Sequence, residues 1–184
     1  FVYHSARKET IHPFDFAVKE GETIGVIGGT GSGKSTFVSL IARLYDVTSG
    51  RILYRRVDEK ELKPEFIRGK IGFVPQKASL FEGSLRDNMK WGKEDATDEE
   101  IYQALDIAQA REFVDQKEQG LDFRIEQNGG NLSGGQKQRL TIARALVRKP
   151  EILILDDSAT ALDFATDARL RKAIKENTDN MTVF

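Results

Sequence analysis

Cysteine is absent from this 184-residue sequence, and histidine is scarce, with only His4 and His12. Without a thiol, the chain can form no disulfide, no cysteine-ligated zinc site and no thiolate nucleophile. The two histidines do not have the spacing of paired metal ligands on a helix, and both are expected on the surface. Thiol redox chemistry and cysteine-based zinc binding are therefore excluded.

The sequence also lacks an excess of charge of either sign, since 28 Lys and Arg residues face 29 Asp and Glu residues. That balance provides no overall basic field, so a nucleic acid is not an expected partner. Apolar residues make up 39%, which is enough for a core. No apolar run approaches the ~18 residues of a membrane span, and no signal peptide opens the chain.

The two ends of the sequence indicate a piece of a longer protein. The first residue is Phe1 rather than Met, and residues 181–184 read as the start of a buried strand. We therefore expect further chain in the parent protein, and the missing membrane span carries no conclusion about that parent.

The hydrophobic pattern predicts an α/β fold. The expected strands are 14–18, 24–27, 51–55, 71–74 and 152–155. The expected helices are 34–45, 97–109, 110–116, 133–149 and 164–175. The middle of the chain, roughly 78–130, reads as a mostly helical insertion into an α/β core.

A glycine-rich stretch, "GGTGSGKST", lies between the first of these helices and the strand before it. It matches the pattern G-x-x-x-x-G-K-[ST] over Gly28–Ser35. In such a loop, glycines permit successive backbone N–H groups to point at phosphate oxygens, and the following helix presents its positive N-terminal end to the same anion. Lys34 is expected to reach the β- and γ-phosphates, and the Ser35 hydroxyl to ligate Mg²⁺.

The alternative for this stretch is a glycine-rich turn that binds nothing, but the flanking strand and helix are the context that the motif requires. The glycines do not match the dinucleotide pattern, which disfavours NAD. The residues expected to contact the nucleotide are Gly28, Gly29, Thr30, Gly31, Ser32, Gly33, Lys34, Ser35 and Thr36.

The apolar run 152–155 ends in two carboxylates, Asp156 and Asp157. Ligands of α/β sheets bind beyond the carboxyl ends of the strands, so we expect Asp156 on a strand that neighbours the one leading into Gly28. There it would hold Mg²⁺ through water. The alternative is an Asp that caps the turn after the strand.

A second stretch, "NLSGGQKQR" at 131–139, also has the features of an anion site. Ser133 and Gln136 form a capping box, and two adjacent glycines stand at the expected helix N-terminus. A well-capped helix start is the simpler interpretation. One nucleotide does not need two such loops.

The order and spacing of "GGTGSGKST", "LSGGQ" and "ILILD" resemble the ATP-binding cassette family over nearly the whole chain. The resemblance implies a P-loop NTPase core of the α/β class with a mainly parallel sheet, an N-terminal antiparallel β subdomain and an inserted α-helical subdomain. It implies an ATP-binding core at 1–77 and 131–184, a helical subdomain at 78–130, and a sequence that stops before the family's switch histidine.

In that family two cassettes pair head to tail, and each ATP lies between the Walker A loop of one and the signature loop of the other. ATP and Mg²⁺ are therefore the implied cofactors, and a second cassette is the implied partner. The resemblance assigns to the partner's ATP the signature residues Leu132, Ser133, Gly134, Gly135 and Gln136.

Further positions match the family residue by residue. Gln76, after "GFVP", matches the Q-loop glutamine, so Ser35, Gln76 and Asp156 are the implied metal ligands. Tyr3 matches the aromatic residue that stacks on adenine, and a tyrosine packed in the core is the alternative. Asp163, which closes "TALD", matches the loop that crosses the dimer interface.

The segments "FEGSLRDNM" at 81–89 and "EQNGGN" at 126–131 resemble the exporter branch of the family. In that branch the helical insertion contacts a membrane domain. The resemblance therefore implies a transmembrane domain fused upstream of Phe1 and a place at the cytoplasmic face of the cell membrane.

Asp157 departs from the family, which usually has Glu after the Walker B Asp to orient and polarise the attacking water. The Asp side chain is shorter by one C–C bond, ~1.5 Å. A general base must lie about 2.6–3.2 Å from its water, and a misplacement of ~1 Å costs about 100-fold. With Lys34 and Gln76 as the other expected catalytic residues, ATP binding should persist while hydrolysis is slow.

Asp157 beside an intact signature resembles the degenerate-site subunit of heterodimeric bacterial multidrug-type exporters, whose partner has Glu at that position. The alternatives are a soluble cassette ATPase and a non-catalytic nucleotide-sensing module, which Asp157 favours. A P-loop kinase would leave "LSGGQ" unexplained. Chromosome-maintenance cassettes separate the Walker A loop from the signature by a long coiled coil, whereas Lys34 and Ser133 lie too close in this sequence for one.

Overall fold

The computed structural model describes residues 1–4, 8–158, 161–178 and 180–184. Its centre is a parallel sheet in the order β3 (Ile71–Val74), β6 (Ile152–Leu155) and β7 (Thr182–Val183). β3 and β6 are short runs with almost no polar side chains, as expected when both faces of a parallel sheet are covered.

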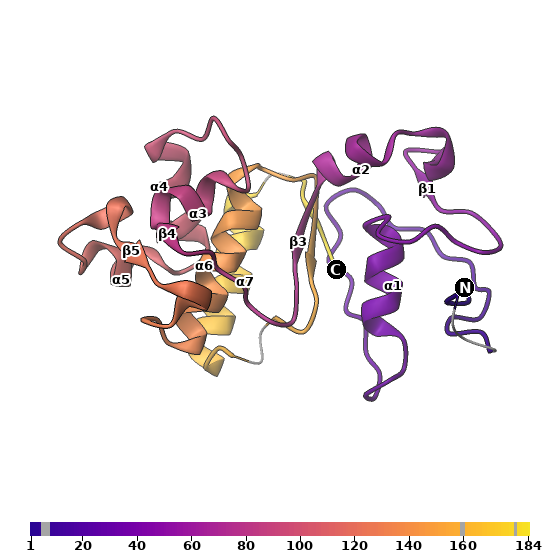
Figure 1. Ribbon diagram of the computed structural model, residues 1–184. Helices are drawn as coiled ribbons and strands as arrows, with labels where there is room; N and C mark the ends of the chain where they lie inside the picture. The colour runs from indigo at the N-terminus through magenta and orange to yellow at the C-terminus, as the bar shows by residue number, and fades with distance from the viewer. Residues whose placement is uncertain (5–7, 159–160, 179) are drawn as a thin grey trace.

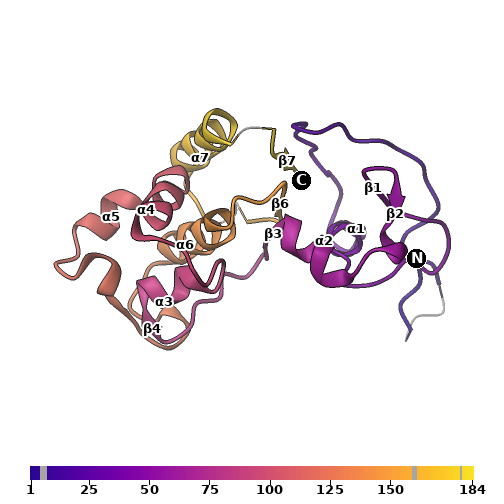
Figure 2. The same ribbon diagram turned by 90° about the horizontal axis from the view of Figure 1, so that it is seen from above.

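Two helices cover the opposite faces of this sheet (Figures 1 and 2). They are α1 (Lys34–Ile41) on one side and α6 (Gly134–Val147) on the other. Because side chains alternate along a strand, Ile154 packs in a cluster with Val38 of α1, whereas Leu153 belongs to the larger core around α6. The sheet therefore joins two separate hydrophobic clusters.

The remaining elements surround these layers. They are β1 (Leu53–Tyr54), β2 (Val57–Asp58), η1 (Glu59–Glu61), α2 (Pro64–Lys70), β4 (Gly83–Ser84), α3 (Leu85–Lys90), α4 (Asp98–Ile107), α5 (Arg111–Asp115), η2 (Gly120–Asp122), β5 (Arg124–Ile125), η3 (Gln127–Gly129) and α7 (Phe164–Asn177). Within the described residues, no helix combines the length and apolarity needed to cross a bilayer.

The predicted α/β class is confirmed, with a parallel sheet and two antiparallel pairs, β1–β2 and β4–β5. The strands expected at 71–74 and 152–155 form as predicted. The helix expected at 97–109 forms as α4 and begins with a capping box, since the Thr97 hydroxyl accepts from the Glu100 N–H at 3.2 Å and the Glu100 carboxylate accepts from the Thr97 N–H at 3.1 Å.

Two strands predicted near the N-terminus do not form. Residues 14–18 and 24–27 are irregular, and Thr23 alone makes a parallel bridge, to Val183. Phe14 and Phe16 instead place their rings 5.8 Å from that of Phe37 on α1. The alternating pattern of 14–18 thus serves aromatic packing rather than a sheet.

The predicted neighbour of the Asp156 strand is also wrong. β6 pairs with β3 and β7, and the segment that leads into Gly28 meets the sheet beside β7, through the parallel bridge of Thr23 with Val183. β7 therefore lies between the two segments that carry Gly28 and Asp156. The last residues of the chain, read as the start of a buried strand, supply this intervening strand.

The helix predicted to run from Lys34 to Tyr45 ends earlier, at Ile41. Arg43 has a left-handed backbone with φ of 49°, which stops the helix. Leu44 and Tyr45, expected on the helix, are about half exposed, at 48% and 47%.

The hairpin formed by β1 and β2 is attached to the central sheet through Glu151. The hydroxyl of Tyr54 donates to this carboxylate, and Arg55 and Lys70 pair with it at 3.0 Å and 2.7 Å. Burial and the Glu151 carboxylate raise the pKa of Tyr54 to about 12. Three donors thus converge on the residue that precedes β6.

The tip of this hairpin has backbone strain that glycine would relieve. Its two loop residues, Arg55 and Arg56, both have positive φ, 49° and 69°, as a type I′ turn requires and as glycine prefers. We expect Arg56→Gly to raise the free energy of unfolding by about 0.5–1 kcal/mol, because the left-handed strain outweighs the added chain entropy. Urea unfolding midpoints test this. Arg51→Gly, which removes an exposed Arg with no such strain, should not stabilise the protein; equal gains from both would contradict the explanation.

Candidate functional site

The glycine-rich loop 28–33 leads directly into α1. Gly31 and Gly33 have positive φ, 79° and 92°, and Gly33 is the N-cap of the helix. A Cβ at Gly28 would lie 2.4 Å from Ser32 Oγ, so a larger residue there would force the Ser32 side chain to move. The loop therefore needs glycine for both its path and its compactness, as a backbone phosphate cradle does.

Two side chains from the first turn of α1 stand at this loop. Lys34 Nζ donates to the carbonyl oxygens of Gly28 and Gly29 at 2.8 Å and 3.0 Å. Ser35 Oγ donates to Asp156 Oδ1 at 3.0 Å. An ammonium group, a hydroxyl and a carboxylate are thus brought to the positive end of one helix.

The oxygen donors of Ser35 and Asp156 fit a hard cation such as Mg²⁺, which takes few protein ligands and keeps water or phosphate oxygens for the rest. Among the described residues, no group of three or more His, Asp or Glu side chains gathers as metal ligands. A magnesium ion shared with a nucleotide phosphate suits this pair better than a cage made by protein alone.

The pairing of β3 with β6 brings the next two site residues together. Val74 lies opposite Leu155 in the register, and Asp156 N donates to Val74 O at 3.0 Å. Two residues beyond each strand, Gln76 Nε2 donates to Asp157 Oδ2 at 3.0 Å. Asp157 has a left-handed φ of 49°, which Asp tolerates better than longer side chains do.

Tyr3 lies beside the phosphate loop. Its hydroxyl is 2.9 Å from Thr36 Oγ1, on α1. Its half-buried ring contacts Phe1 and Tyr45 edge to face, with centroids 4.8 Å and 5.2 Å away. The tyrosine therefore belongs to an aromatic cluster beside the first turn of α1.

The second glycine loop lies apart from the first. Ser133 N donates to Gln136 Oε1 at 2.9 Å and Gln136 N to Ser133 Oγ at 3.2 Å, so the predicted capping box of α6 forms. Leu132 is buried, Gly134 is exposed, and a Cβ at Gly135 would lie 3.2 Å from the Ala161 carbonyl. Figures 1 and 2 show α6 across the sheet from α1, so the two loops do not face one nucleotide within this chain.

Comparison with known proteins identifies the family. A family model described as ABC transporter matches residues 11–160. The chain belongs to the ABC transporter family. ABC ATP-binding domains bind and hydrolyse ATP, which confirms the expectations of ATP as ligand and of an ATPase fold.

The relatives agree with this assignment. The uncharacterized ABC transporter ATP-binding protein YfiB of Bacillus subtilis is 47% identical over 95% of the chain and 30% of its own length. The probable multidrug resistance ABC transporter ATP-binding/permease protein YheI of the same organism is 41% identical over 100% of the chain and 32% of its own. The ABC chain described here spans about a third of the length of these relatives.

A solved structure of a bacterial Atm1-family ABC exporter with ATP bound has the same fold. It matches with a TM-score of 0.93 at 32% identity and covers 99% of this chain and 32% of its own.

Arg139, which no motif of the sequence singled out, holds the signature loop of this ABC domain in place. Its guanidinium donates to Gln109 O at 2.6 Å and to Gly135 O at 3.3 Å, and it lies 5.0 Å from the centroid of the Phe113 ring. Burial lowers the pKa of Arg139. Its position four residues after Gly135, on the same helix face, was the available signal.

Asp163, expected at the dimer interface, is the N-cap of α7 and is exposed. Its carboxylate accepts from Thr166 N at 2.9 Å and from Thr166 Oγ1 at 2.7 Å. Hydrogen bonds from the Thr166 side chain and backbone hold the pKa of Asp163 below its usual value. The ionised cap thus stabilises the loop before α7.

The cap predicts a pH-dependent stability. Because the folded-state pKa of Asp163 lies below its unfolded value, its contribution is present above the ordinary Asp pKa of about 4 and is lost as the pH falls through the folded value. Asp163→Ala should lower the thermal midpoint at neutral pH, and the gap to wild type should narrow in acid. Asp163→Ser, which caps without a charge, should show no such narrowing; a constant gap for Asp163→Ala would refute the argument.

Proposed function

We propose that this chain is the ATP-hydrolysing motor domain of an ABC exporter. The observation that carries the proposal is the contact between Ser35 and Asp156, 3.0 Å long, at the N-terminus of a helix whose Lys34 lies over the glycine loop. In this proposal Lys34 and the loop N–H groups bind the ATP phosphates and Tyr3 stacks on adenine. A second ABC domain, pairing head to tail, is the proposed partner.

Magnesium is part of the proposal. Ser35 and Asp156 would hold it, with Gln76 as a further oxygen ligand, and the bound ion would offset the charge of the phosphates. The Lys34 ammonium and the helix terminus contribute to the same neutralisation.

The location of the signature loop supports the head-to-tail pairing. Ser133 and Gln136 satisfy their own backbone groups, while Gly134 is exposed at the start of a helix long enough to have a positive end. This end lies across the sheet from the phosphate loop (Figure 1), so an ATP held here would have to come from another domain. Ala161 and Leu162, which precede Asp163, lie against Gly135, so the loop expected to cross that interface adjoins the signature loop.

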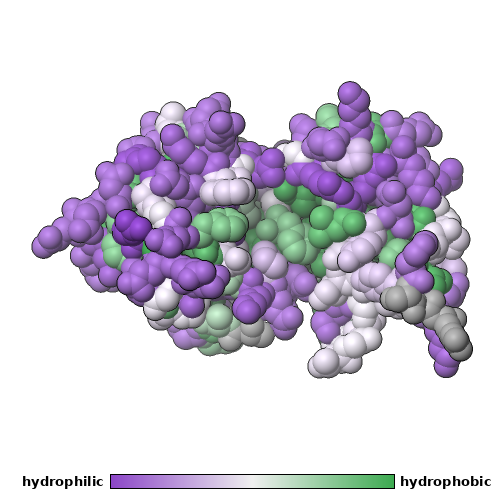
Figure 3. Space-filling model, viewed as in Figure 1, coloured by the Kyte–Doolittle hydropathy of each residue, from purple (hydrophilic) through white to green (hydrophobic). Residues whose placement is uncertain are grey.

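A hollow between the two halves of the molecule supports a further protein partner. Figure 3 shows apolar surface gathered there, and the lining includes Ile71, Phe73 and Trp91. Trp91 is 71% exposed and stacks on Phe81 with centroids 4.7 Å apart. We assign this surface to a transmembrane domain, fused upstream in the parent protein, which puts the chain at the cytoplasmic face of the membrane.

The division into a core of 1–77 and 131–184 and a helical insertion of 78–130 belongs to the same proposal. Transmitting ATP closure from α1 to the insertion requires a shared element. β3, which ends before Gln76, lies between the two clusters and is the element we assign to that role.

We propose that the ATP site built on this chain's own phosphate loop hydrolyses ATP slowly. The Asp157 carboxylate accepts a hydrogen bond from Gln76. Because the Asp side chain is shorter than that of Glu by ~1.5 Å, its carboxylate cannot reach the attacking water at the distance that a general base requires. We therefore propose a heterodimer in which the partner domain, with Glu after its Walker B Asp, has the faster site. A non-catalytic nucleotide-sensing module is the second candidate, and Asp157 is the observation that favours it.

The phosphate assignment is tested by Lys34→Ala. Loss of hydrogen bonds to a charged ligand is worth about 2 kcal/mol, so Kd for ATP should rise roughly thirtyfold. Titration calorimetry with Mg-ATP measures the change. Lys172→Ala, on exposed α7, is the matched control and should leave Kd unchanged. If Lys34→Ala bound ATP as tightly as wild type, the proposed site would be wrong.

The slow site is tested in the assembled transporter by single-turnover hydrolysis. With Asp157, about half of the bound ATP should remain after the fast phase, because one of two sites lacks a placed base. Asp157→Glu should allow the retained ATP to be hydrolysed. The gain in rate should be smaller than a base at the ideal position would give, because Glu tolerates the left-handed backbone at this position less well than Asp does. Asp157→Asn, equal in size but uncharged, is the control and should keep ATP. Complete hydrolysis at one rate by wild type would rule out a degenerate site.

A further inference from the structure

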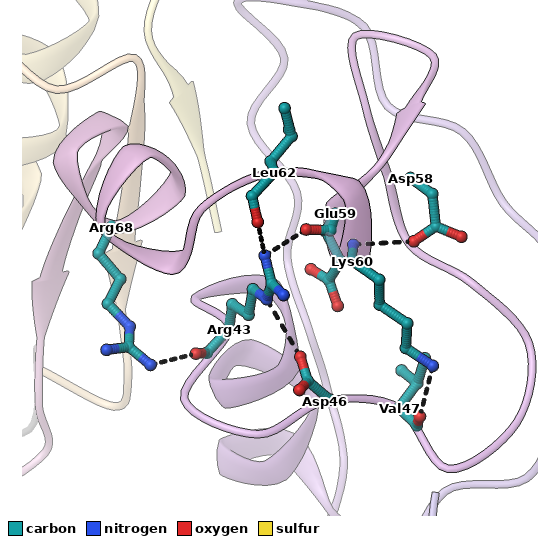
Figure 4. A network of polar contacts seen from close by, with 8 residues as sticks. All are labelled: Arg43, Asp46, Val47, Asp58, Glu59, Lys60, Leu62 and Arg68. Atoms are coloured by element: carbon teal, nitrogen blue, oxygen red, sulfur yellow. Dashed lines mark hydrogen bonds and ion pairs between the residues drawn. The ribbon is translucent and has the colours of Figure 1, made fainter.

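Two charged side chains are buried outside the proposed site, just beyond the C-terminal end of α1. Arg43 follows the helix and is 8% exposed, and Glu59, in η1, is 1% exposed. Figure 4 shows them side by side, with Asp46 next to both. Burying charge is costly unless every partner is in place, so their contacts define what they do.

Arg43 ties the end of α1 to the segment around η1. Its guanidinium donates to the backbone carbonyls of Glu59 and Leu62, the latter at 2.5 Å, and to Asp46 Oδ1 at 3.1 Å. Its own carbonyl accepts from Arg68 Nη2 of α2 at 2.8 Å (Figure 4). Arg43 has a left-handed φ of 49°, and its contacts cross the junction between the end of α1 and the segments η1 and α2. The C-terminal end of the helix is thus fixed from two sides.

Glu59 is the incompletely satisfied member of this network. Within the part of the chain that the structure describes, its Oε1 has no hydrogen-bond partner. The charged groups that face it are Arg43, Asp46, Asp58 and Lys60. Burial raises the pKa of Glu59 to about 7, and the attraction of Arg43 offsets this only in part.

We propose that Arg43 is a positioning residue for the phosphate-binding helix α1, and that the ionisation of the buried Glu59 beside it loosens this hold. The inference rests on the proposed ATP site at the other end of the same helix. It adds a proton-linked control of that site.

The length of α1 makes the coupling direct. Its 8 residues span about 12 Å as a rigid helix, so a shift at Arg43 is transmitted to Lys34 and Ser35. An ionised Glu59 draws the guanidinium away from the carbonyls of residues 59 and 62 and requires water for its unpaired oxygen. Both changes open the junction that fixes the helix end.

The sign of the pH effect follows from linkage. The folded-state pKa of Glu59 lies above its unfolded value, so the stability contributed by the protonated group is present at acid pH and is lost as pH rises through about 7. ATP affinity should fall over the same window. By reciprocity, bound ATP should favour the protonated carboxyl.

The experiment measures Kd for Mg-ATP on the chain at about pH 6 and about pH 8, on either side of the Glu59 midpoint. Wild type should bind several-fold more weakly at the higher pH. In Glu59→Gln and Glu59→Leu, Kd should keep only the pH dependence that comes from the nucleotide itself. The difference between the pH profiles of wild type and these variants therefore measures the effect of Glu59. Glu61→Gln, exposed on the same η1, is the matched control and should follow wild type.

Arg43→Gln should raise Kd about tenfold at both pH values, as a displaced phosphate-binding group would. Arg43→Lys keeps the charge but cannot reach three acceptors at once, so its Kd should lie between those of wild type and Arg43→Gln. Arg51→Gln, an exposed change of the same kind, should have no effect. Comparable stability of wild type and Arg43→Lys, read from urea midpoints, separates positioning from unfolding.

The inference is overturned if Glu59→Gln and Glu59→Leu retain the pH profile of wild type, or if both Arg43 variants bind ATP like wild type. These failures differ from failure of the proposed function. In that case wild type and Lys34→Ala would bind ATP equally.

Discussion

The pairing of β3 with β6 is the contact on which the site depends. Because the two strands are parallel and in register from Ile71 with Ile152 to Val74 with Leu155, the residues that follow them emerge at one edge. Gln76 meets Asp157 there, and Asp156 turns toward Ser35. A shift of this register by one residue would exchange the faces of the sheet and separate every one of these groups.

The motifs were readable from sequence because they are local. A phosphate loop needs glycines and a helix start within a few residues, and a capping box needs only positions 133 and 136. The buried strands at 71–74 and 152–155 were equally clear, since short apolar runs bounded by polar residues have few other uses.

What the sequence did not reveal depends on contacts between distant segments. The alternation of apolar and polar residues at 14–18 predicted a strand, but the rings of Phe14 and Phe16 pack against Phe37 on α1. The position of β7 between β6 and Thr23 is a matter of topology, which no local pattern encodes. Arg43 appeared to continue a helix that its own left-handed backbone ends.

The edge of the sheet beside β7 leaves aliphatic side chains exposed next to the phosphate loop. Ile24 N donates to Val183 O at 2.8 Å, and then the segment leaves the sheet with Val26 37% and Ile27 98% exposed. Backbone groups and bare aliphatic side chains at a strand edge are a template for pairing with another copy. Self-association of the isolated chain should therefore begin at this edge and grow with concentration, and because Ile27 is followed directly by Gly28 of the phosphate loop, bound nucleotide should affect it.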